Sequence, residues 1–362
     1  MPSYGPRALV NLAVPSGWDA AALERIRLQD GTTILAVVQL LQAAVSGVNA
    51  ELAADPLIGG LTYQTTDRTV RYRDGGGTTE MDVHTEYGLP REERGVTNGH
   101  MLPRTKRDAG LAWTWDYLND AIMDDIMADI QLATDRIRNT FQKAVLTRLF
   151  SNAQNTVETS GLDVGLADGS ASGVIWTPSP YDGATFLSTH THYNERAAVS
   201  MTNLNADVKH VREHGHMPPY WLLISEADRA TWTALSGYVK PTAEGIRAGA
   251  SVDVATVGED FIGVIDTDYG GLWVRPSNRI PTNYYAVVKS YGRNHPRNAL
   301  RWWYNPRFGA GVSLLPGKEY RSFPVEGVQM YTEFGFGGNQ DRTVAAMTEI
   351  GAGGSYTVPT IG

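Results

Sequence analysis

The longest regular pattern of apolar and polar positions in this chain runs from Thr114 to about Phe150. No proline or glycine interrupts the stretch, and its apolar residues recur every three or four positions, the spacing of one helix face. These positions are Leu118, Ile122, Ile126, Ile130, Ala133, Ile137, Phe141, Val145 and Leu149. Acidic residues fill the first half and basic residues the second, which complements the helix dipole. We predict one continuous helix with Thr114 as its N-cap. Such a helix is compatible with a long core helix in an ordinary two-domain protein.

Two shorter helical patterns precede it, at about residues 19–28 and 33–54. The second ends at Asp55-Pro56, because proline stops a helix. Residues 1–17 carry three prolines and two glycines without periodicity, which is typical of an extended arm. The apolar run from Ile34 to Val45 is about twelve residues long, whereas a membrane span needs roughly 20. The N-terminus also lacks the pattern of a signal peptide. We therefore predict a helical N-terminal arm and no membrane partner.

Residues 57–110 combine strand-like patterns with a high density of charge. Strands are predicted at Thr62–Thr65 and Thr69–Arg73, and another alternating run follows the three glycines at 75–77. Apolar residues are too few to build a core, and eight basic residues are matched by eight acidic ones. An extended hairpin that cannot bury itself either lies on a partner surface or is a flexible insertion. The interleaved charges favour ion pairs with a partner.

The remainder of the chain alternates helical and strand patterns. A small-residue loop at 160–173 follows the long helix and indicates a domain boundary. Downstream we predict a helix at 204–213, a buried strand at 220–224, a helix at 226–235 capped by Ser225, and strands at 261–265, 271–274 and 284–288. Two final strands, at 325–336 and 343–350, are predicted to be joined by a hairpin-like connection around residues 337–341. The fold class is therefore α+β.

The composition excludes several classes of function. The chain has 362 residues and 42% hydrophobic content, enough for two domains with a sizeable core. It has no cysteine, which excludes disulfides, thiolate catalysis and cysteine-type zinc sites. A formal charge of -8 argues against a dominant basic surface that grips nucleic acid.

The histidines offer the sharpest candidate for chemistry. His190 and His192 are two positions apart, and His210 and His214 are four apart on a predicted helix, a spacing that can hold one metal ion. The stretch reads HVREH and lacks the glutamate of HExxH, and the sequence fixes no third ligand. A polar role at the surface or core edge is favoured, so we predict no metal, no cofactor and no catalytic residue.

Other catalytic and nucleotide-binding motifs fail. Ser225 follows a predicted strand and opens a helix, but no flanking glycines make it a nucleophile elbow. The run Gly335–Gln340 lacks the last glycine of GxGxxG and is more typical of a turn. No GxxxxGK[ST] is present. The acidic residues of the long helix are typical of solvated partners of the helix dipole rather than of a cation site.

Taken in order, these features resemble the major capsid proteins of tailed bacteriophages, whose fold encapsulins share. The residues that carry the resemblance are the loop Thr62–Arg107, the spine-like helix Thr114–Phe150 and the terminal EFGFGGNQDRTVAAMTEI, Glu333–Ile350. By this resemblance residues 1–55 are the N-terminal arm, 56–112 the extended loop, 113–200 the peripheral domain with the spine helix, 201–324 the axial α/β domain, and 325–362 the return strands that complete the peripheral domain. We expect the apolar face of the spine helix to pack on these strands.

The resemblance implies a structural protein rather than an enzyme. Subunits would assemble into pentamers and hexamers of an icosahedral head that encloses double-stranded DNA without reading its sequence. The location would be the virion, assembled in the host cytoplasm, and scaffolding, portal and decoration proteins would be further partners. The alternatives are an encapsulin-like nanocompartment shell and, less favoured, a soluble metal-dependent enzyme that uses the histidines.

In this family the extended loop contacts neighbouring subunits. The charged residues that we expect to make such contacts are Arg68, Arg71, Arg73, Glu86, Arg91, Glu92, Glu93, Arg94, Arg104, Lys106 and Arg107. Some relatives join neighbouring loops by a Lys–Asn isopeptide bond, and here Lys106 is the only lysine of the loop region and Asn339 lies in the C-terminal segment. No motif in the sequence establishes that cross-link.

Overall fold

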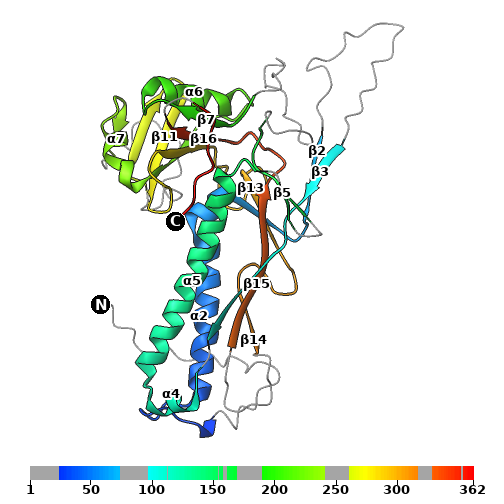
Figure 1. Ribbon diagram of the computed structural model, residues 1–362, viewed down its shortest axis with the longest axis vertical. Coiled ribbons are helices and arrows are strands. Elements are labelled where there is room, and N and C mark those ends of the chain that lie inside the picture. Colours follow the sequence, from blue (N-terminus) through cyan, green and yellow to red (C-terminus); the bar gives the residue numbers. More distant parts are fainter. Residues whose placement is uncertain are drawn as a thin grey trace. The chain divides into compact units, whose positions relative to one another are not determined.

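The computed structural model describes residues 24–73, 97–111, 113–153, 155–157, 161–168, 190–240, 261–316, 328–351 and 354–362 (Figure 1). The chain divides into two compact units. The first, here called the helical unit, comprises residues 1–54, 105–141 and 304–333. The second, the sheet unit, comprises residues 55–104, 142–303 and 334–362. Helix α5 and strands β13 and β15 contribute residues to both.

Two long helices dominate the helical unit. Helix α2 (Ile34–Ala54) buries one face, formed by Ile34, Val37, Val38, Leu41, Val45, Val48 and Leu52. Helix α5 (Met123–Phe150) runs beside it, and Arg138 of α5 forms an ion pair with Glu51 of α2 at 2.6 Å (Figure 1). The neighbour of this part of α5 is therefore an N-terminal helix, whereas we expected the C-terminal strands. By length and composition alone α2 is apolar enough to cross a membrane, and 33% of its apolar window is buried; core helices pass the same test, so this is weak evidence for a span.

The predicted single helix is broken in two. Helix α4 (Trp115–Asp120) ends at Ala121, whose backbone is extended, and α5 begins at Met123. The break is stabilised by side chains that cap the exposed amides: the Ile122 amide donates to the Asp125 carboxylate, and the Met123 amide donates to that of Asp30. Thr114 caps α4 as predicted, because its hydroxyl accepts from the Tyr117 amide. Periodicity alone missed the break because the apolar spacing continues across it.

The strands of the helical unit surround the first part of β15 (Val328–Gly338). Strand β14 (Ser313–Pro316) pairs with it in antiparallel fashion, and β4 (Thr105–Leu111) also pairs with β15. The segment before β14 is fixed to α2, because the Asn49 amide donates to the Val312 carbonyl and its oxygen accepts from the Val312 amide, both at 2.8 Å.

The sheet unit is built on a seven-stranded sheet with the order β7-β16-β12-β8-β11-β10-β9. Its strands are β7 (Tyr193–Arg196), β16 (Ala345–Ile350), β12 (Tyr284–Val288), β8 (Tyr220–Ser225), β11 (Gly270–Ser277), β10 (Gly263–Thr267) and β9 (Tyr238–Val239). The pairs β7–β16 and β8–β11 are parallel, and the other pairs are antiparallel. The predicted strands at 220–224, 271–274 and 284–288 are confirmed.

Helices α6 (Met201–Arg212) and α7 (Arg229–Thr233) enclose the core of this sheet with their apolar residues. Trp232 of α7 packs edge-on against Tyr285 of β12, with ring centres 4.8 Å apart. The predicted helix at 204–213 is confirmed. The helix predicted behind Ser225 begins as a 3-10 turn (Glu226–Asp228), and the Ser225 side chain makes no capping hydrogen bond, so that part of the prediction is wrong.

The two C-terminal strands do not form the predicted hairpin. Strand β16 pairs with β12 and β7 in the seven-stranded sheet, whereas β15 lies in another sheet with β14 and β13. The glycine-rich run that we assigned to a turn is the end of β15 itself. The glycines serve close packing there: a Cβ at Gly335 would lie 1.9 Å from the Pro103 carbonyl oxygen, and one at Gly337 would lie 2.6 Å from Leu102.

The start of the predicted loop agrees with the sequence reading. Asp55 caps a short helix, α3 (Pro56–Leu61), which the sequence did not predict. Strand β1 (Thr62–Thr65) pairs in parallel with β13 (Leu300–Tyr304), and β2 (Thr69–Arg73) pairs with β3 (Thr97–Met101) as an antiparallel hairpin (Figure 1). A small separate hairpin is formed by β5 (Asn155–Val157) and β6 (Gly161–Asp163). The predicted strands at 62–65 and 69–73 are confirmed.

Candidate functional site

The base of the hairpin has a small core of its own, contrary to our expectation that this segment buries little. Val70, Leu102 and Trp303 form a buried apolar cluster. Arg68 covers it: the guanidinium donates to the Leu102 carbonyl from Nε at 3.1 Å and from a terminal nitrogen at 2.7 Å. The same group lies 5.2 Å from the ring centre of Trp303, a cation–π distance. Burial and the charge of Arg104 lower the pKa of Arg68.

The other candidate contact residues fall into three groups. Arg71, Lys106 and Arg107 are exposed, and Arg104 is half-buried. The backbone of Arg73 pairs with Thr97 at the outer end of the hairpin. The remaining candidates lie outside the described residues: Glu86, Arg91, Glu92, Glu93 and Arg94. The described part of the hairpin therefore presents an exposed positive charge at Arg71, and no ion pair joins Arg71 to another described residue.

A buried polar layer holds the hairpin to β13. Arg301 donates to the Thr69 carbonyl at 2.8 Å and to the Asn339 side-chain oxygen at 3.2 Å. The Asn339 amide in turn donates to the carbonyls of Pro296 and Asn298, at 2.7 and 2.9 Å. Asn339 is fully buried. Its amide is thus occupied inside its own unit, which disfavours the cross-link to a lysine that the resemblance implied.

Four histidines come together beside the seven-stranded sheet. His190 and His192 lie just before β7, and His210 and His214 lie in the last turn of α6 and the turn after it. The Nε2 atom of His214 is 3.1 Å from that of His192 and 3.3 Å from that of His190. His210 stacks on His190 with ring centres 5.2 Å apart, and its Nδ1 lies 3.7 Å from the Glu213 carboxylate.

The sequence placed His210 and His214 on one helix but did not bring His190 and His192 to them. Strand β7 pairs in parallel with β16, and this pairing fixes the segment before β7 next to the end of α6. Burial, reinforced by the neighbouring histidines, lowers the pKa of His190 to about 4 and that of His214 to about 3. Burial also lowers the pKa of His192, which is wholly enclosed. These imidazoles are neutral at pH 7.

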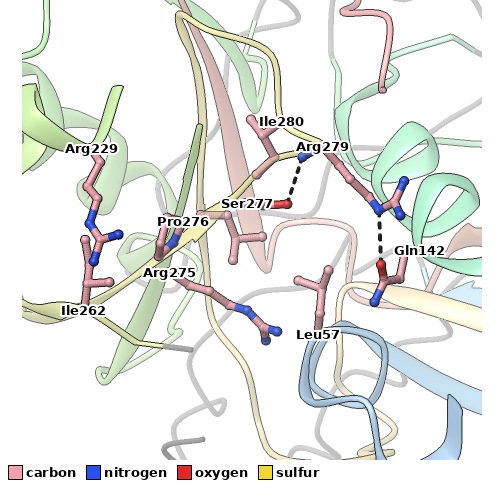
Figure 2. A pocket seen from close by; sticks show the side chains of 10 residues that line it. Leu57, Gln142, Arg229, Ile262, Arg275, Pro276, Ser277, Arg279 and Ile280 are labelled. Carbon is pink, nitrogen blue, oxygen red and sulfur yellow. Dashed lines mark hydrogen bonds between the residues drawn. The ribbon is translucent and has the colours of Figure 1, made fainter. Parts of the chain in front are cut away.

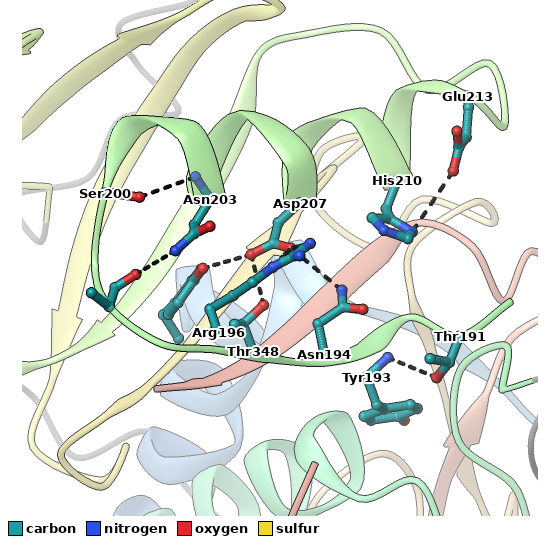
Figure 3. A network of polar contacts seen from close by, with 12 residues as sticks. Thr191, Tyr193, Asn194, Arg196, Ser200, Asn203, Asp207, His210, Glu213 and Thr348 are labelled. Atoms are coloured by element: carbon teal, nitrogen blue, oxygen red, sulfur yellow. Dashed lines mark hydrogen bonds and ion pairs between the residues drawn. The ribbon is translucent and has the colours of Figure 1, made fainter. Parts of the chain in front are cut away.

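A second polar group, buried beneath α6, is structural. Asp207 accepts hydrogen bonds from Arg196 at 2.6 Å and Thr348 at 2.9 Å (Figure 3). It also accepts one from the Tyr285 hydroxyl at 2.5 Å. Burial raises the pKa of Asp207, and the positive charge of Arg196 opposes that effect. Ser200 caps the same helix by accepting from the Asn203 amide (Figure 3). The network joins α6 to β7, β12 and β16.

A cavity of about 380 Å³ in the sheet unit is lined by Leu57, Gln142, Leu223, Arg229, Ile262, Arg275, Pro276, Ser277, Arg279 and Ile280 (Figure 2). None of these ten residues is acidic or a histidine. Arg279 is anchored by its Nε, which donates to the Gln142 side-chain oxygen at 3.1 Å, and the Ser277 hydroxyl accepts from the Arg279 amide. The lining has no base beside its one hydroxyl, so it lacks the pairing that nucleophilic catalysis requires.

No family model matches the chain, and no curated protein matches it significantly. Among solved structures it is similar to one from Mycobacterium phage Patience, at 23% identity, with 92% of each chain covered and a TM-score of 0.60. The capsid of Ralstonia phage GP4 aligns at 10% identity, covering 80% of this chain and 86% of that one, with a TM-score of 0.44. The holo-SrpI encapsulin complex from Synechococcus elongatus PCC 7942 aligns at 11% identity, covering 80% and 85%, with a TM-score of 0.38.

The likeness to the Patience structure extends over almost the whole length of both chains. At this identity it establishes the fold. The mixed helix-and-sheet architecture that we expected from the resemblance to tailed-phage capsid proteins is confirmed at that level, and the fold assignment rests on the Patience structure.

Proposed function

We propose that this chain is the major capsid protein of a tailed bacteriophage and acts by self-assembly rather than by catalysis. The observation that carries the proposal is the fold shared with the Mycobacterium phage Patience structure over 92% of both chains. Many copies would form pentamers and hexamers of an icosahedral head that encloses double-stranded DNA, in the virion, after assembly in the host cytoplasm.

Within this proposal the segments take the roles that the sequence resemblance implied. Residues 1–55 are the N-terminal arm, 56–112 the extended loop, 113–200 with 325–362 the peripheral domain, and 201–324 the axial domain. The hairpin of β2 and β3 supports the loop assignment, because it leaves the sheet unit as a two-stranded ribbon with an exposed arginine, Arg71. Scaffolding, portal and decoration proteins are the further partners that this role would require.

Electron microscopy of the purified chain tests the proposal directly. We expect closed shells or rings of five and six subunits, formed by the chain alone or with a co-expressed scaffolding protein. A chain that stays monomeric or dimeric under every assembly condition, including co-expression with the neighbouring genes of its genome, would overturn it.

The second candidate is an encapsulin-like shell that holds protein cargo. The structural likeness supports it less well, because the encapsulin alignment is much poorer than that to the Patience structure. The contents of shells purified from the native source separate the two: double-stranded DNA indicates a phage head, and a packaged enzyme without DNA indicates a nanocompartment.

A further inference from the structure

The histidine cluster has a geometry that the shell function does not explain. The Nε2 atom of His214 lies 3.3 Å from that of His190 and 3.1 Å from that of His192, and the three histidines offer ligand atoms that all lie within 4.8 Å of one another. They come from two separate segments, one before β7 and one after α6. His192 is fully buried, whereas His190 and His214 are half-buried, so one side of the group is enclosed and the other is accessible.

Neutral imidazoles in this arrangement cannot all form good hydrogen bonds to one another. The Nδ1 atom of His192 lies 2.8 Å from the Ala345 carbonyl oxygen, which only accepts, so the proton of His192 is on Nδ1 and its Nε2 presents a lone pair. His214 Nε2 then faces this lone pair and His190 Nε2 together. A single N–H shared between two acceptors makes only weak three-centre hydrogen bonds, and any other placement leaves lone pairs or protons facing each other.

A metal ion satisfies all three nitrogens at once. Zinc binds imidazole nitrogen at about 2.0–2.1 Å with tetrahedral geometry, which places two ligand nitrogens roughly 3.3–3.4 Å apart. The observed separations of 3.1 and 3.3 Å are close to that value. The hydrogen bond from His192 Nδ1 to the backbone is also the usual outer-shell contact that orients a metal-binding histidine.

We propose that His190, His192 and His214 bind one zinc ion through their Nε2 atoms. Imidazole-only ligand sets suit zinc among the common divalent ions, and hard cations such as Mg²⁺ prefer oxygen. Three protein ligands leave the fourth position for water on the accessible side. The ion would connect the segment before β7 directly to the turn after α6.

The neighbouring residues define the competing arrangement. His190, His210 and Glu213 form a second possible set of three ligand atoms, also within 4.8 Å of one another. It shares His190 with the first set but uses a carboxylate, and its His210 ring stacks on His190. The first set is favoured because its two separations that involve His214 are close to the value for tetrahedral zinc and because His192 is already oriented by Ala345.

The test is zinc binding by the full-length chain purified without a histidine tag and treated with chelator. Titration calorimetry is expected to show one tight site per chain. Cobalt, used as a visible probe of the same site, is expected to give the d–d absorption of a four-coordinate ion. Bound zinc should also raise the unfolding temperature, because an ion that binds only the folded state stabilises it.

Variants separate the two ligand sets. His214→Gln should weaken zinc binding by about 100-fold or more, since even changes to outer-shell partners cost about 10–100-fold. His192→Gln should do the same, and His190→Gln, at a half-buried position, provides a second ligand variant that is less prone to unfold. His210→Gln should leave the affinity within a few-fold. His295→Gln, outside the cluster, is the matched control and should bind as the unchanged chain does.

Three outcomes would overturn the proposal. These are no zinc binding by the unchanged chain, binding that is equal in the unchanged chain and a folded His214→Gln variant, and loss of binding in His210→Gln but not in His192→Gln. Circular dichroism of each variant identifies the folded ones. The measurement uses the subunit itself, so its result does not depend on whether the chain forms a shell.

Discussion

The seven-stranded sheet and the charged hairpin are two parts of the same sheet unit with opposite relations to solvent. Between the sheet and α6, polar groups are buried in pairs, as Asp207 of α6 is with Arg196 of β7 and Tyr285 of β12. The hairpin buries three apolar residues at its base and leaves Arg71 exposed beyond them. The contrast teaches that the buried network of Asp207 stabilises one subunit, whereas the exposed side chain of Arg71 is accessible for contacts outside it. We therefore expect changes in the sheet to lower the stability of the subunit, and changes in the outer part of the hairpin to impair assembly without lowering stability.

The largest expected effect is on assembly and comes from the hairpin. Replacing residues 75–96 by a short glycine-containing turn joins β2 to β3 just beyond the Arg73–Thr97 pair and leaves the register of both strands intact. We expect a subunit that unfolds cooperatively at nearly the original temperature but forms no closed shells under electron microscopy. Normal shells would show that the outer loop does not serve contacts between subunits, and a subunit that no longer folds would contradict the expectation that the loop is dispensable for the fold.

The next effect is on stability and comes from the sheet. Asp207→Ala removes the partner of Arg196 and leaves the hydroxyls of Tyr285 and Thr348 without their acceptor. Breaking a buried ion pair from one side costs about 3–5 kcal/mol. Chemical denaturation followed by circular dichroism measures this loss. Asp266→Ala, at an exposed aspartate of β10, is the control and should change the free energy of unfolding by less than about 0.5 kcal/mol. Equal effects at the two positions would contradict the structural role of the network.

A smaller effect is expected at the glycines of β15, against which the segment just after β3 packs. An alanine at Gly335 would place its Cβ 1.9 Å from the Pro103 carbonyl oxygen, a backbone atom that cannot rotate away. Overpacking of this kind costs about 1–3 kcal/mol. Gly47→Ala is the opposite control: this exposed position of α2 has open space around it, and alanine should stabilise the helix by about 0.5–1 kcal/mol. Differential scanning calorimetry should show unfolding temperatures that move in opposite directions.

The local pattern predicted most of the elements, because each depends on residues close in sequence. The strand at 220–224 and the helix at 204–213 follow from apolar spacing alone. Pairing between distant strands was not predictable in this way. Strand β16 is separated from β12 by more than fifty residues, and only the folded sheet shows that it joins β12 and β7 instead of returning along β15.

The same limit applies to the candidate sites. Exposed charge at Arg71 could be predicted from composition, but the contacts that commit Arg68 to Trp303 and Leu102 could not. The histidines illustrate the limit most clearly. Sequence spacing related His210 to His214, whereas the closest nitrogen contacts join His214 to His190 and His192, which the β7–β16 pairing delivers. The break at Ala121 was hidden for a similar reason, since Asp30, which caps α5, is far away in the sequence.

The smallest expected effect compares two arginines three positions apart in the hairpin. Arg68→Ala removes two hydrogen bonds to the Leu102 carbonyl and the cover over Trp303, and should lower the free energy of unfolding by about 1 kcal/mol. Arg71→Glu changes an exposed side chain and should alter it by less than about 0.5 kcal/mol. If Arg71 contacts a neighbouring subunit, its reversal should slow shell formation, and added salt should reduce the difference from the unchanged chain by screening the charges. Light scattering during assembly at two salt concentrations measures this. If the Arg71→Glu chain assembles as fast as the unchanged chain at both salt concentrations, Arg71 is not part of the contact surface.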